Sequence, residues 1–358
     1  MLENIVAQFL KIEDKYLVRP YGNGHIHDTY RVESKEPESP DFLLQKINKT
    51  VFSEPEKLME NIVIATEFLK SNASDTRQLT VVKTLSGASF LLDEAGDYWR
   101  MYPFFSDLIS YDVPHEDPAI ALTQIAGAGR AFGQFVSDLR ELPIEKIHPV
   151  LPDFHRVTWR LEQLQAAIQE NPVDRVASVE REISLVKKLI PKMTLLDAWL
   201  DMGMIPQRIT HNDTKFNNVL FDKNNVAQVI VDLDTIMPGC VHFDYGDGLR
   251  TAAVTAAEDA VEQVTVDWDR YDAFHAGYIS AAEDWLTPFE LETLPLAAPA
   301  ITYIMAVRFL TDYINGDVYF KTNGPVQNLR RAQAQLKLAQ LFLLRNVEEV
   351  ESPFISIG

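Results

Sequence analysis

One stretch near the middle of the chain limits its possible folds more than any other. Residues 209–218 read Ile-Thr-His-Asn-Asp-Thr-Lys-Phe-Asn-Asn and are followed by a short apolar run at 219–221. Residues 222–225, Asp-Lys-Asn-Asn, then precede a second apolar run at 226–231. Asp and Asn tolerate the backbone angles of a tight connection. The pattern therefore predicts a β-hairpin with a polar loop leading into it and an acidic loop leaving it.

Three oxygen-bearing side chains flank this hairpin, namely Asp213, Asn218 and Asp232. Antiparallel pairing would hold all three at one end, a set that suits phosphoryl transfer. That reaction needs a carboxylate to orient and deprotonate the attacking hydroxyl, and Mg²⁺ to neutralise phosphate oxygens. We assign Asp213 as the base and Asn218 and Asp232 as metal ligands. A lone His-x-Asp or Asp-x-Asp is usually a solvated turn or a helix cap, whereas the combination favours catalysis.

The spacing His211-x-Asp213-x-x-x-x-Asn218 resembles the catalytic loop of the protein-kinase-like fold. His-Asn-Asp in place of His-Arg-Asp, and Asp-Leu-Asp in place of Asp-Phe-Gly, make it more similar to the aminoglycoside phosphotransferase and choline kinase branch. The longer strings at 211–218 and 231–250 resemble the N-acetylhexosamine 1-kinases within that branch. The resemblance implies an enzyme that uses ATP and Mg²⁺.

Composition excludes several classes of function. The 358 residues are 46% hydrophobic, which is typical of a globular chain. A formal net charge of −19 disfavours nucleic acid as a partner, because nonspecific binding depends on Lys and Arg at phosphates. With Cys240 as its single cysteine, the chain has no intrachain disulfide. We find neither a signal peptide nor an apolar run that would span a membrane. We therefore expect a cytoplasmic protein that is a monomer or a weak homo-oligomer.

The first third of the chain reads as an antiparallel sheet of about five strands packed on one helix. The resemblance implies an α+β, two-lobed protein-kinase-like fold. Its nucleotide-binding lobe would span residues 1–105, and a mainly helical catalytic and substrate-binding lobe would span 106–358. The segments predicted as strands are 16–21, 31–33, 42–48, 78–83, 89–92 and 98–102. The segments predicted as helices are 2–12, 55–69, 118–142, 161 onward, 177–201, 253–264, 267–284 and 301–313.

A Gly-Asn-Gly turn joins the first two predicted strands. Glycine allows a backbone to approach phosphates closely, so Gly22 and Gly24 are predicted to contact the nucleotide. A plain hairpin turn is the alternative for so short a motif. In sugar 1-kinases a similar Tyr-Gly-x-Gly-His-Ile string contacts both nucleotide and sugar. The resemblance therefore makes Ile26 a candidate for the sugar site.

Two further nucleotide contacts follow from the resemblance. Lys46 lies inside an apolar strand and would hold the α- and β-phosphates while pairing with a helix glutamate. Glu60 is the predicted partner, and Glu67 lies on the same helix. A solvated strand-edge lysine is the alternative. Pro103 and Phe104 would form the hinge that binds adenine.

The acceptor site is predicted from the same resemblance. Thr235 follows the metal aspartate, and Arg308 and Tyr319 belong to a string similar to the one that lies near the sugar in these kinases. Asp213 would orient the sugar hydroxyl. A single buried Arg is otherwise half of a structural ion pair, although its fixed fork of donors also suits carbonyls and hydroxyls.

Supporting residues around the catalytic loop are also predicted. Asp244 and Asp247 would brace the catalytic loop through backbone hydrogen bonds. His155 and Arg160 could face the site, with a structural histidine as the favoured interpretation.

The leading hypothesis is phosphorylation of the anomeric hydroxyl of GlcNAc or GalNAc. A choline or aminoglycoside kinase is the first alternative, and Arg250 and Arg308 count against it because they would repel a cation. A catalytically silent, kinase-like binding protein is the second alternative.

Overall fold

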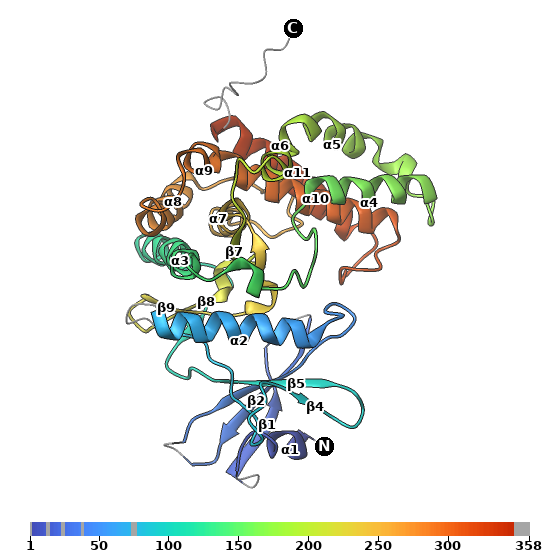
Figure 1. Ribbon diagram of the computed structural model, residues 1–358. Coiled ribbons are helices and arrows are strands. Elements are labelled where there is room, and N and C mark those ends of the chain that lie inside the picture. Colours follow the sequence, from blue (N-terminus) through green and yellow to red (C-terminus); the bar gives the residue numbers. More distant parts are fainter. Residues whose placement is uncertain (1, 12–14, 23–25, 37–38, 73–76, 347–358) are drawn as a thin grey trace. The chain divides into compact units, whose positions relative to one another are not determined.

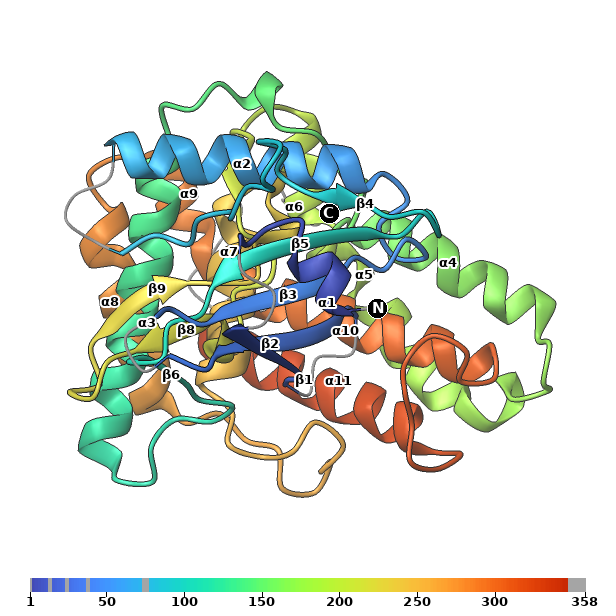
Figure 2. The ribbon, with the colours of Figure 1, turned by 90° about the horizontal axis from the view of Figure 1, so that it is seen from below.

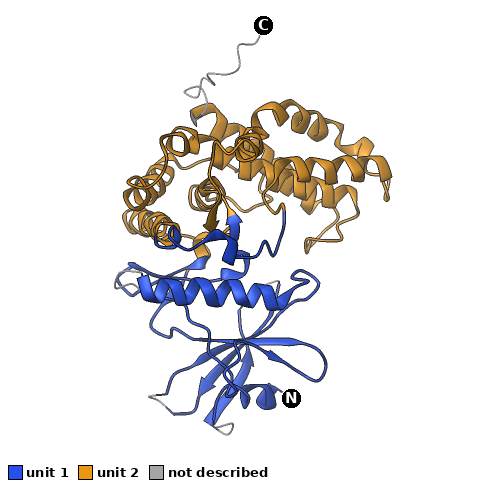
Figure 3. Cartoon of the chain, in the orientation of Figure 1, with its two compact units in different colours: residues 1–110, 138–152, 218–238 blue, residues 111–137, 153–217, 239–358 orange. Residues whose placement is uncertain are grey.

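The computed structural model describes residues 2–11, 15–22, 26–36, 39–72 and 77–346. The chain divides into two compact units (Figure 3). Unit 1 comprises residues 1–110, 138–152 and 218–238, and unit 2 comprises 111–137, 153–217 and 239–358. The predicted hairpin and the Asp-Leu-Asp segment therefore belong to unit 1, whereas the loop that carries Asp213 belongs to unit 2.

Unit 1 is built on a five-stranded antiparallel sheet with the strand order β1-β2-β3-β5-β4 (Figure 2). The sheet strands are β1 (Tyr16–Pro20), β2 (Asp28–Ser34), β3 (Phe42–Lys46), β4 (Leu91–Leu92) and β5 (Tyr98–Pro103). The short helix α1 (Leu2–Val6) packs on one face of this sheet. The shared core on that face contains Ile5, Val6, Phe9, Val32, Leu44, Trp99 and Met101. Apolar residues at alternate strand positions explain why one face is buried against the helix.

A helix and a second sheet complete unit 1. Helix α2 (Pro55–Asn72) begins with proline, which suits the first helical turn, and it contacts the short helix η5 (Leu233–Thr235). The strands β6 (Ile109–Ser110), β8 (Val219–Phe221) and β9 (Ala227–Ile230) form the second sheet. The predicted hairpin is thus confirmed. The strand predicted at 78–83 is wrong, because only a single bridge joins Val82 to Met101.

Unit 2 is mainly helical (Figure 1). Its centre is α10 (Ala297–Ile314), which packs against α4, α5, α7 and α11. The other main helices are α3 (Pro118–Leu139), α4 (Val157–Glu170), α5 (Glu180–Met193), α6 (Leu195–Asp201), α7 (Val241–Ala252), α8 (Trp268–Ala282), α9 (Pro288–Thr293) and α11 (Gln327–Asn346). Among the described residues, the remaining strands are β7 (Arg208–Thr210), which belongs to unit 2, and β10 (Met237–Gly239), whose first two residues belong to unit 1. An α+β fold with a sheet lobe and a helical lobe is confirmed.

Two helix predictions need correction. Residues 253–264 are loop and turn rather than helix; they are rich in acidic residues and carry little apolar periodicity. The long helix predicted at 177–201 is interrupted at Thr194, three residues after Pro191 inside α5. Proline removes a backbone donor and crowds the preceding turn, which favours such a break.

The sequence was expected to contain no apolar run that would span a membrane, but one segment in the described part of the chain, Pro288–Ile314, is long and apolar enough by length and composition. Its most apolar window is 83% buried inside the protein. Several of its residues, including Ile301, Tyr303 and Phe309, belong to the main core of unit 2. We therefore interpret it as a core helix. Cys240 is buried in the same core.

Candidate functional site

The loop that carries Asp213 is fixed by a buried carboxylate. Asp244, in the first turn of α7, accepts backbone hydrogen bonds from His211 (2.8 Å) and Asn212 (2.7 Å). The Thr214 hydroxyl donates to the Asp244 carbonyl. Burial raises the pKa of Asp244 to about 6, against the opposing effect of His211 and these backbone donors. The prediction that Asp244 braces this loop is confirmed.

The backbone before Asp213 adopts an uncommon conformation. Asn212 has φ +62°, in the left-handed region, and its side chain is bonded to the hydroxyl and carbonyl of Thr210. The Asn212 carbonyl accepts from Nε2 of His155 at 2.9 Å. A Cβ on Gly239 would lie 2.3 Å from the Thr210 hydroxyl. Left-handed non-glycine residues persist where the surroundings hold them, and they concentrate at functional sites.

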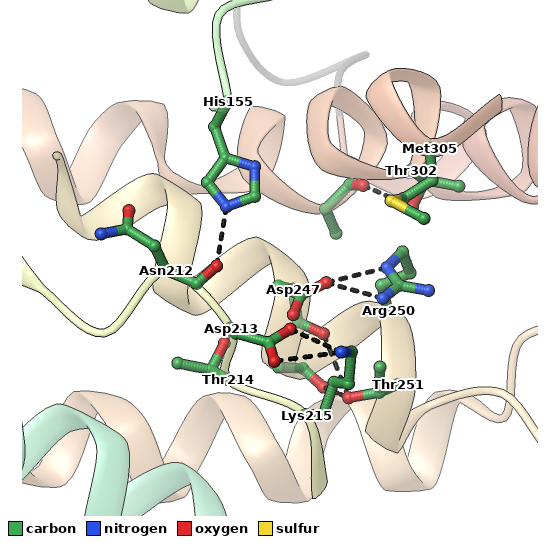
Figure 4. A network of polar contacts seen from close by, with 12 residues as sticks. His155, Asn212, Asp213, Thr214, Lys215, Asp247, Arg250, Thr251, Thr302 and Met305 are labelled. Atoms are coloured by element: carbon green, nitrogen blue, oxygen red, sulfur yellow. Dashed lines mark hydrogen bonds and ion pairs between the residues drawn. The ribbon is translucent and has the colours of Figure 1, made fainter. Parts of the chain in front are cut away.

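Asp213 lies beside a cation in this loop. Its carboxylate is 2.8 Å from Nζ of Lys215 (Figure 4). Burial alone would raise the pKa of Asp213, but Lys215, together with His211 and Arg250, lowers it below the ordinary value. The group is therefore ionised at neutral pH. An ionised carboxylate can accept a hydrogen bond from a hydroxyl and orient it for attack.

Asp247 does not form the predicted hydrogen bond with the backbone of the catalytic loop. It accepts two hydrogen bonds from the Arg250 guanidinium, at 2.9 and 2.7 Å. Both residues lie in α7, three positions apart, so they face the same side of the helix. Arg250 in turn lies close enough to Asp213 to lower the pKa of that carboxyl. Asp247 thus acts on the site through Arg250.

The hairpin of unit 1 brings the two predicted metal ligands to one end. Val219 pairs with Ile230, and the Val231 amide donates to the Asn218 carbonyl at 2.9 Å. Asn218 and Asp232 thus flank the same end of the ribbon. Asp232 has φ +60° and ψ +58°, so this second loop also holds a non-glycine residue in the left-handed region.

These two side chains suit Mg²⁺. They offer an amide oxygen and a carboxylate, both hard donors, and Mg²⁺ is usually held by one or two carboxylates plus phosphates and water. No cluster of three or more His, Cys, Asp or Glu side chains that could hold a metal occurs among the residues that the structure describes. An amide oxygen and a carboxylate are a donor set that fits Mg²⁺.

The second aspartate of Asp-Leu-Asp has a different environment, which the sequence analysis missed. Asp234 is 4% exposed and forms a two-pronged ion pair with Arg100 of β5 and a hydrogen bond with Nε2 of His27. Burial opposes ionisation, but Arg100 and His27 bring the pKa of Asp234 well below its ordinary value. The sequence offered one signal of this ion pair, namely an arginine inside the apolar strand at 98–102, which would need an acidic partner if buried.

The predicted ion pair between Lys46 and Glu60 is wrong. Lys46 pairs with Asp97 at 2.5 Å, and Glu60 contacts His148 at 2.8 Å. Lys46 lies opposite Trp99 in the sheet, so Asp97, two residues before Trp99, is its diagonal neighbour on the same face. Glu67, the other candidate, is 3.4 Å from a different lysine, Lys83.

The strand register places Lys46 away from Asp234. Gln45 lies opposite Arg100, and the Arg100 Nε donates to the Gln45 side chain at 3.0 Å. Successive strand residues point to opposite faces. Lys46, with Nζ 5.9 Å from the Trp99 ring centroid, is therefore on the face that α1 covers, and Arg100 is on the other.

The other predicted nucleotide contacts are only partly described. Gly22 has φ +78°, which favours glycine, whereas Gly24 lies outside the described residues. The Phe104 amide donates to the Asp41 carbonyl at 2.9 Å, so it does not offer a free hinge donor. Pro103 ends β5. Ile26 is 43% exposed.

The predicted acceptor residues Arg308 and Tyr319 of unit 2 lie together, and two phenylalanines that the sequence did not single out lie beside them. The Arg308 guanidinium lies 5.3 Å from the ring centre of Phe154, 5.8 Å from that of Tyr319 and 5.4 Å from that of Phe320. Among the residues described, no carboxylate forms an ion pair with Arg308 or Arg160, and burial lowers the pKa of both.

The loop that carries Tyr319 is held by one buried carboxylate. Asp312 accepts backbone hydrogen bonds from Val318, Tyr319 and Phe320 at 3.0, 2.8 and 2.9 Å.

Thr235, the remaining residue predicted to contact the acceptor, is a buried residue of η5 in unit 1.

Comparison with known proteins agrees with this architecture. An aminopropanol kinase associated with a microcompartment superposes with a TM-score of 0.68 at 15% identity, over 96% of this chain and 97% of that one. An aminoglycoside phosphotransferase from Alicyclobacillus acidocaldarius gives 0.62 at 14% identity, over 98% and 96%. A spectinomycin phosphotransferase in complex with ADP and spectinomycin gives 0.57 at 12% identity, over 91% and 92%. At these identities the likeness establishes the fold.

The family follows from the sequence itself. Residues 17–278, most of the chain, match the model of the phosphotransferase enzyme family (APH). This range includes the loops that carry Asp213 and Asp232, the hairpin between them in sequence and the β3–β5 strand pair. The chain belongs to the phosphotransferase enzyme family and is a kinase-like small-molecule phosphotransferase.

Proposed function

We propose that this protein transfers the γ-phosphoryl group of ATP to the anomeric hydroxyl of an N-acetylhexosamine, GlcNAc or GalNAc. The observation that carries the proposal is the ionised Asp213 beside Lys215, on a loop fixed by Asp244. The sugar hydroxyl would donate a hydrogen bond to Asp213 and attack the γ-phosphorus. The bond to the β–γ bridging oxygen would break as the proton passes to Asp213. The products would be ADP and the sugar 1-phosphate.

Asn218 and Asp232 would hold Mg²⁺, which would neutralise charge on the β- and γ-phosphates. The strands of residues 1–105, with Gly22, Gly24 and Lys46, would form the nucleotide-binding lobe, and Pro103 and Phe104 would lie at the adenine. Lys46 pairs with Asp97 on the sheet face that α1 covers, so to reach a phosphate it would have to leave both Asp97 and that face. Residues 106–358 would supply the catalytic loop and the acceptor site.

Arg308 supports an uncharged or electron-rich acceptor. Its guanidinium has aromatic neighbours but no carboxylate partner among the described residues, so it could donate to the carbonyl or hydroxyl oxygens of a sugar. It would repel a cation such as choline. Tyr319 would contact the same sugar, with Thr235 and Ile26 as further contacts. An aminoglycoside is the second candidate acceptor, because two of the similar solved structures are named as aminoglycoside and spectinomycin phosphotransferases.

One assay tests these alternatives. The protein is incubated with ATP and Mg²⁺ and with GlcNAc, GalNAc, glucose, galactose, choline, aminopropanol, kanamycin or spectinomycin, and ADP release is followed. We expect turnover with the N-acetylhexosamines and a ³¹P NMR signal coupled to the anomeric proton. Turnover confined to choline or an antibiotic would reject the sugar assignment. Nucleotide binding without turnover on any acceptor would support a silent binding protein.

Asp213→Asn tests the catalytic assignment. It should lower kcat by about 10² to 10⁴-fold, the usual contribution of a positioned base, and should leave ATP-analogue binding intact. Near-normal turnover would remove Asp213 from the mechanism.

A further inference from the structure

The two carboxylates of Asp-Leu-Asp have different environments in unit 1. Asp232 flanks the end of the hairpin in a left-handed conformation. Asp234 is committed to protein partners, with both of its oxygens bonded to the Arg100 guanidinium and one also to His27. A carboxylate with both oxygens engaged in this way has little capacity left for a metal ion.

Arg100 is placed for this contact by the sheet. It is 1% exposed in the middle of β5, and each of its three nitrogens donates a hydrogen bond. Nε donates to Gln45, and the two terminal nitrogens donate to Asp234. Gln45 in turn donates to Thr29 on β2 at 3.1 Å. The guanidinium is therefore fixed by two neighbouring strands and cannot swing away without breaking buried hydrogen bonds.

His27 connects the same aspartate to the segment after the glycine turn. Its Nδ1 accepts from the Asn48 amide at 3.0 Å, so the ring proton is on Nε2, which donates to Asp234. The Asn48 side chain donates to the Ile26 carbonyl at 3.0 Å. His27 also stacks on Phe52, with the ring centres 5.6 Å apart. The start of β2 and the residues after β3 are thus tied to Asp234.

Helix α2 holds the far side of this segment. Asn61 is 0% exposed and donates to the Ile236 carbonyl at 3.0 Å. The segment from Asp232 to Ile236 is therefore hydrogen-bonded to the sheet at Asp234 and to helix α2 at Ile236. A left-handed aspartate is uncommon and persists where the surrounding structure holds it.

We propose that Arg100, Asp234 and His27 are positioning residues that hold the Asp232 backbone in its metal-binding conformation, and that Asp234 itself does not bind the metal. The inference rests on the proposed binding of Mg²⁺ and ATP at this end of the hairpin. Partners that orient a ligand typically change metal affinity by about 10–100-fold when removed. Loss of Arg100 should therefore weaken metal-dependent nucleotide binding although an arginine cannot ligate Mg²⁺.

Calorimetric titration with the ATP analogue AMP-PNP, in excess Mg²⁺ and in EDTA, tests this inference. The measured quantity is the ratio of the two affinities. We expect Mg²⁺ to tighten binding to the wild-type protein, and we expect Asp234→Asn and Arg100→Gln each to reduce the ratio by about tenfold. The double variant should be no worse than either single variant, because the two residues act as one unit. His27→Gln should have a smaller effect in the same direction.

A matched control separates positioning from loss of folding. Arg208 forms a two-pronged pair with the buried Glu290 in unit 2, with both contacts at 2.7 Å. Arg208→Gln should lower the urea midpoint and leave the Mg²⁺ ratio unchanged. Arg100→Lys keeps the charge but loses the fork, so it supplies a second variant if Arg100→Gln does not fold.

Several results would contradict the inference. If a folded Arg100 variant kept the wild-type ratio of AMP-PNP affinities with and without Mg²⁺, the positioning inference would be overturned and the proposed function would stand. Additive effects in the double variant would have the same consequence. A loss seen only in Asp234→Asn would make Asp234 a direct metal ligand and overturn it equally. A wild-type protein that binds AMP-PNP identically with and without Mg²⁺ would overturn both this inference and the proposed function.

Discussion

Replacing Asp244 with Asn should separate stability from catalysis. The oxygen of the substituted side chain would keep one backbone hydrogen bond, and the new amide NH₂ would face the other backbone N–H. Losing one bond to a charged acceptor costs about 1.5–3 kcal/mol. Removing the charge offsets this loss, because burial raises the pKa of Asp244 from 3.8 to about 6, which corresponds to about 3 kcal/mol. The free energy of unfolding at pH 7 should therefore change by no more than about 1.5 kcal/mol.

Catalysis should respond much more strongly. The clash between two donors displaces His211 or Asn212, the residues immediately before Asp213. A displacement of about 1 Å at a reacting group can lower the rate by about 10²-fold, so we expect kcat to fall by about 10 to 10²-fold. Urea unfolding and steady-state kinetics measure the two quantities. A large loss of stability with normal kcat would refute this reasoning.

The pH dependence of Asp244 has a defined sign. Its folded pKa lies above its unfolded pKa, so the group binds more protons when folded. Its contribution to stability is present below about pH 4 and is lost as the pH rises to about 6. The wild-type protein should therefore gain stability relative to Asp244→Asn when the pH falls from 7 to 5. If the wild-type protein instead lost stability relative to Asp244→Asn when the pH fell from 7 to 5, the raised pKa of Asp244 would be contradicted.

Three substitutions at other positions of unit 2 give further predictions. Asp312→Asn removes an acceptor from the loop of Tyr319, so it should raise the KM for the acceptor with little effect on kcat; a selective fall in kcat would argue against this role. His155→Gln should flatten the pH dependence of stability. Burial lowers the pKa of His155 to about 4, so the free energy of unfolding of the wild type should fall by up to about 3 kcal/mol as the pH drops from 6.5 towards 4. If the urea midpoint changed equally with pH in the wild type and in His155→Gln, His155 would be excluded as the cause. Gly239→Ala should destabilise the protein by about 1–3 kcal/mol, because its Cβ would displace the Thr210 hydroxyl and Asn212; an unchanged midpoint would show that the loop adjusts freely.

The sequence by itself determined the local features. The hairpin after Asn218 was readable from two apolar runs around an Asp-Lys-Asn-Asn turn, because short-range chemistry fixes such a connection. The catalytic-loop spacing led to the kinase-like fold and to a family to which the chain belongs. Asp244 was identified through the same string, since the family motif includes it.

Only the tertiary structure decided which distant charges meet. Lys46 pairs with Asp97 rather than Glu60, and Arg100 meets Asp234 across 134 positions of sequence. Such pairings depend on strand register, and a shift of one residue moves a side chain to the opposite face of the sheet. Periodicity alone does not fix that register in a strand whose Gln45 and Lys46 are both polar, so the buried Arg100–Asp234–His27 network became visible only once the strands were paired.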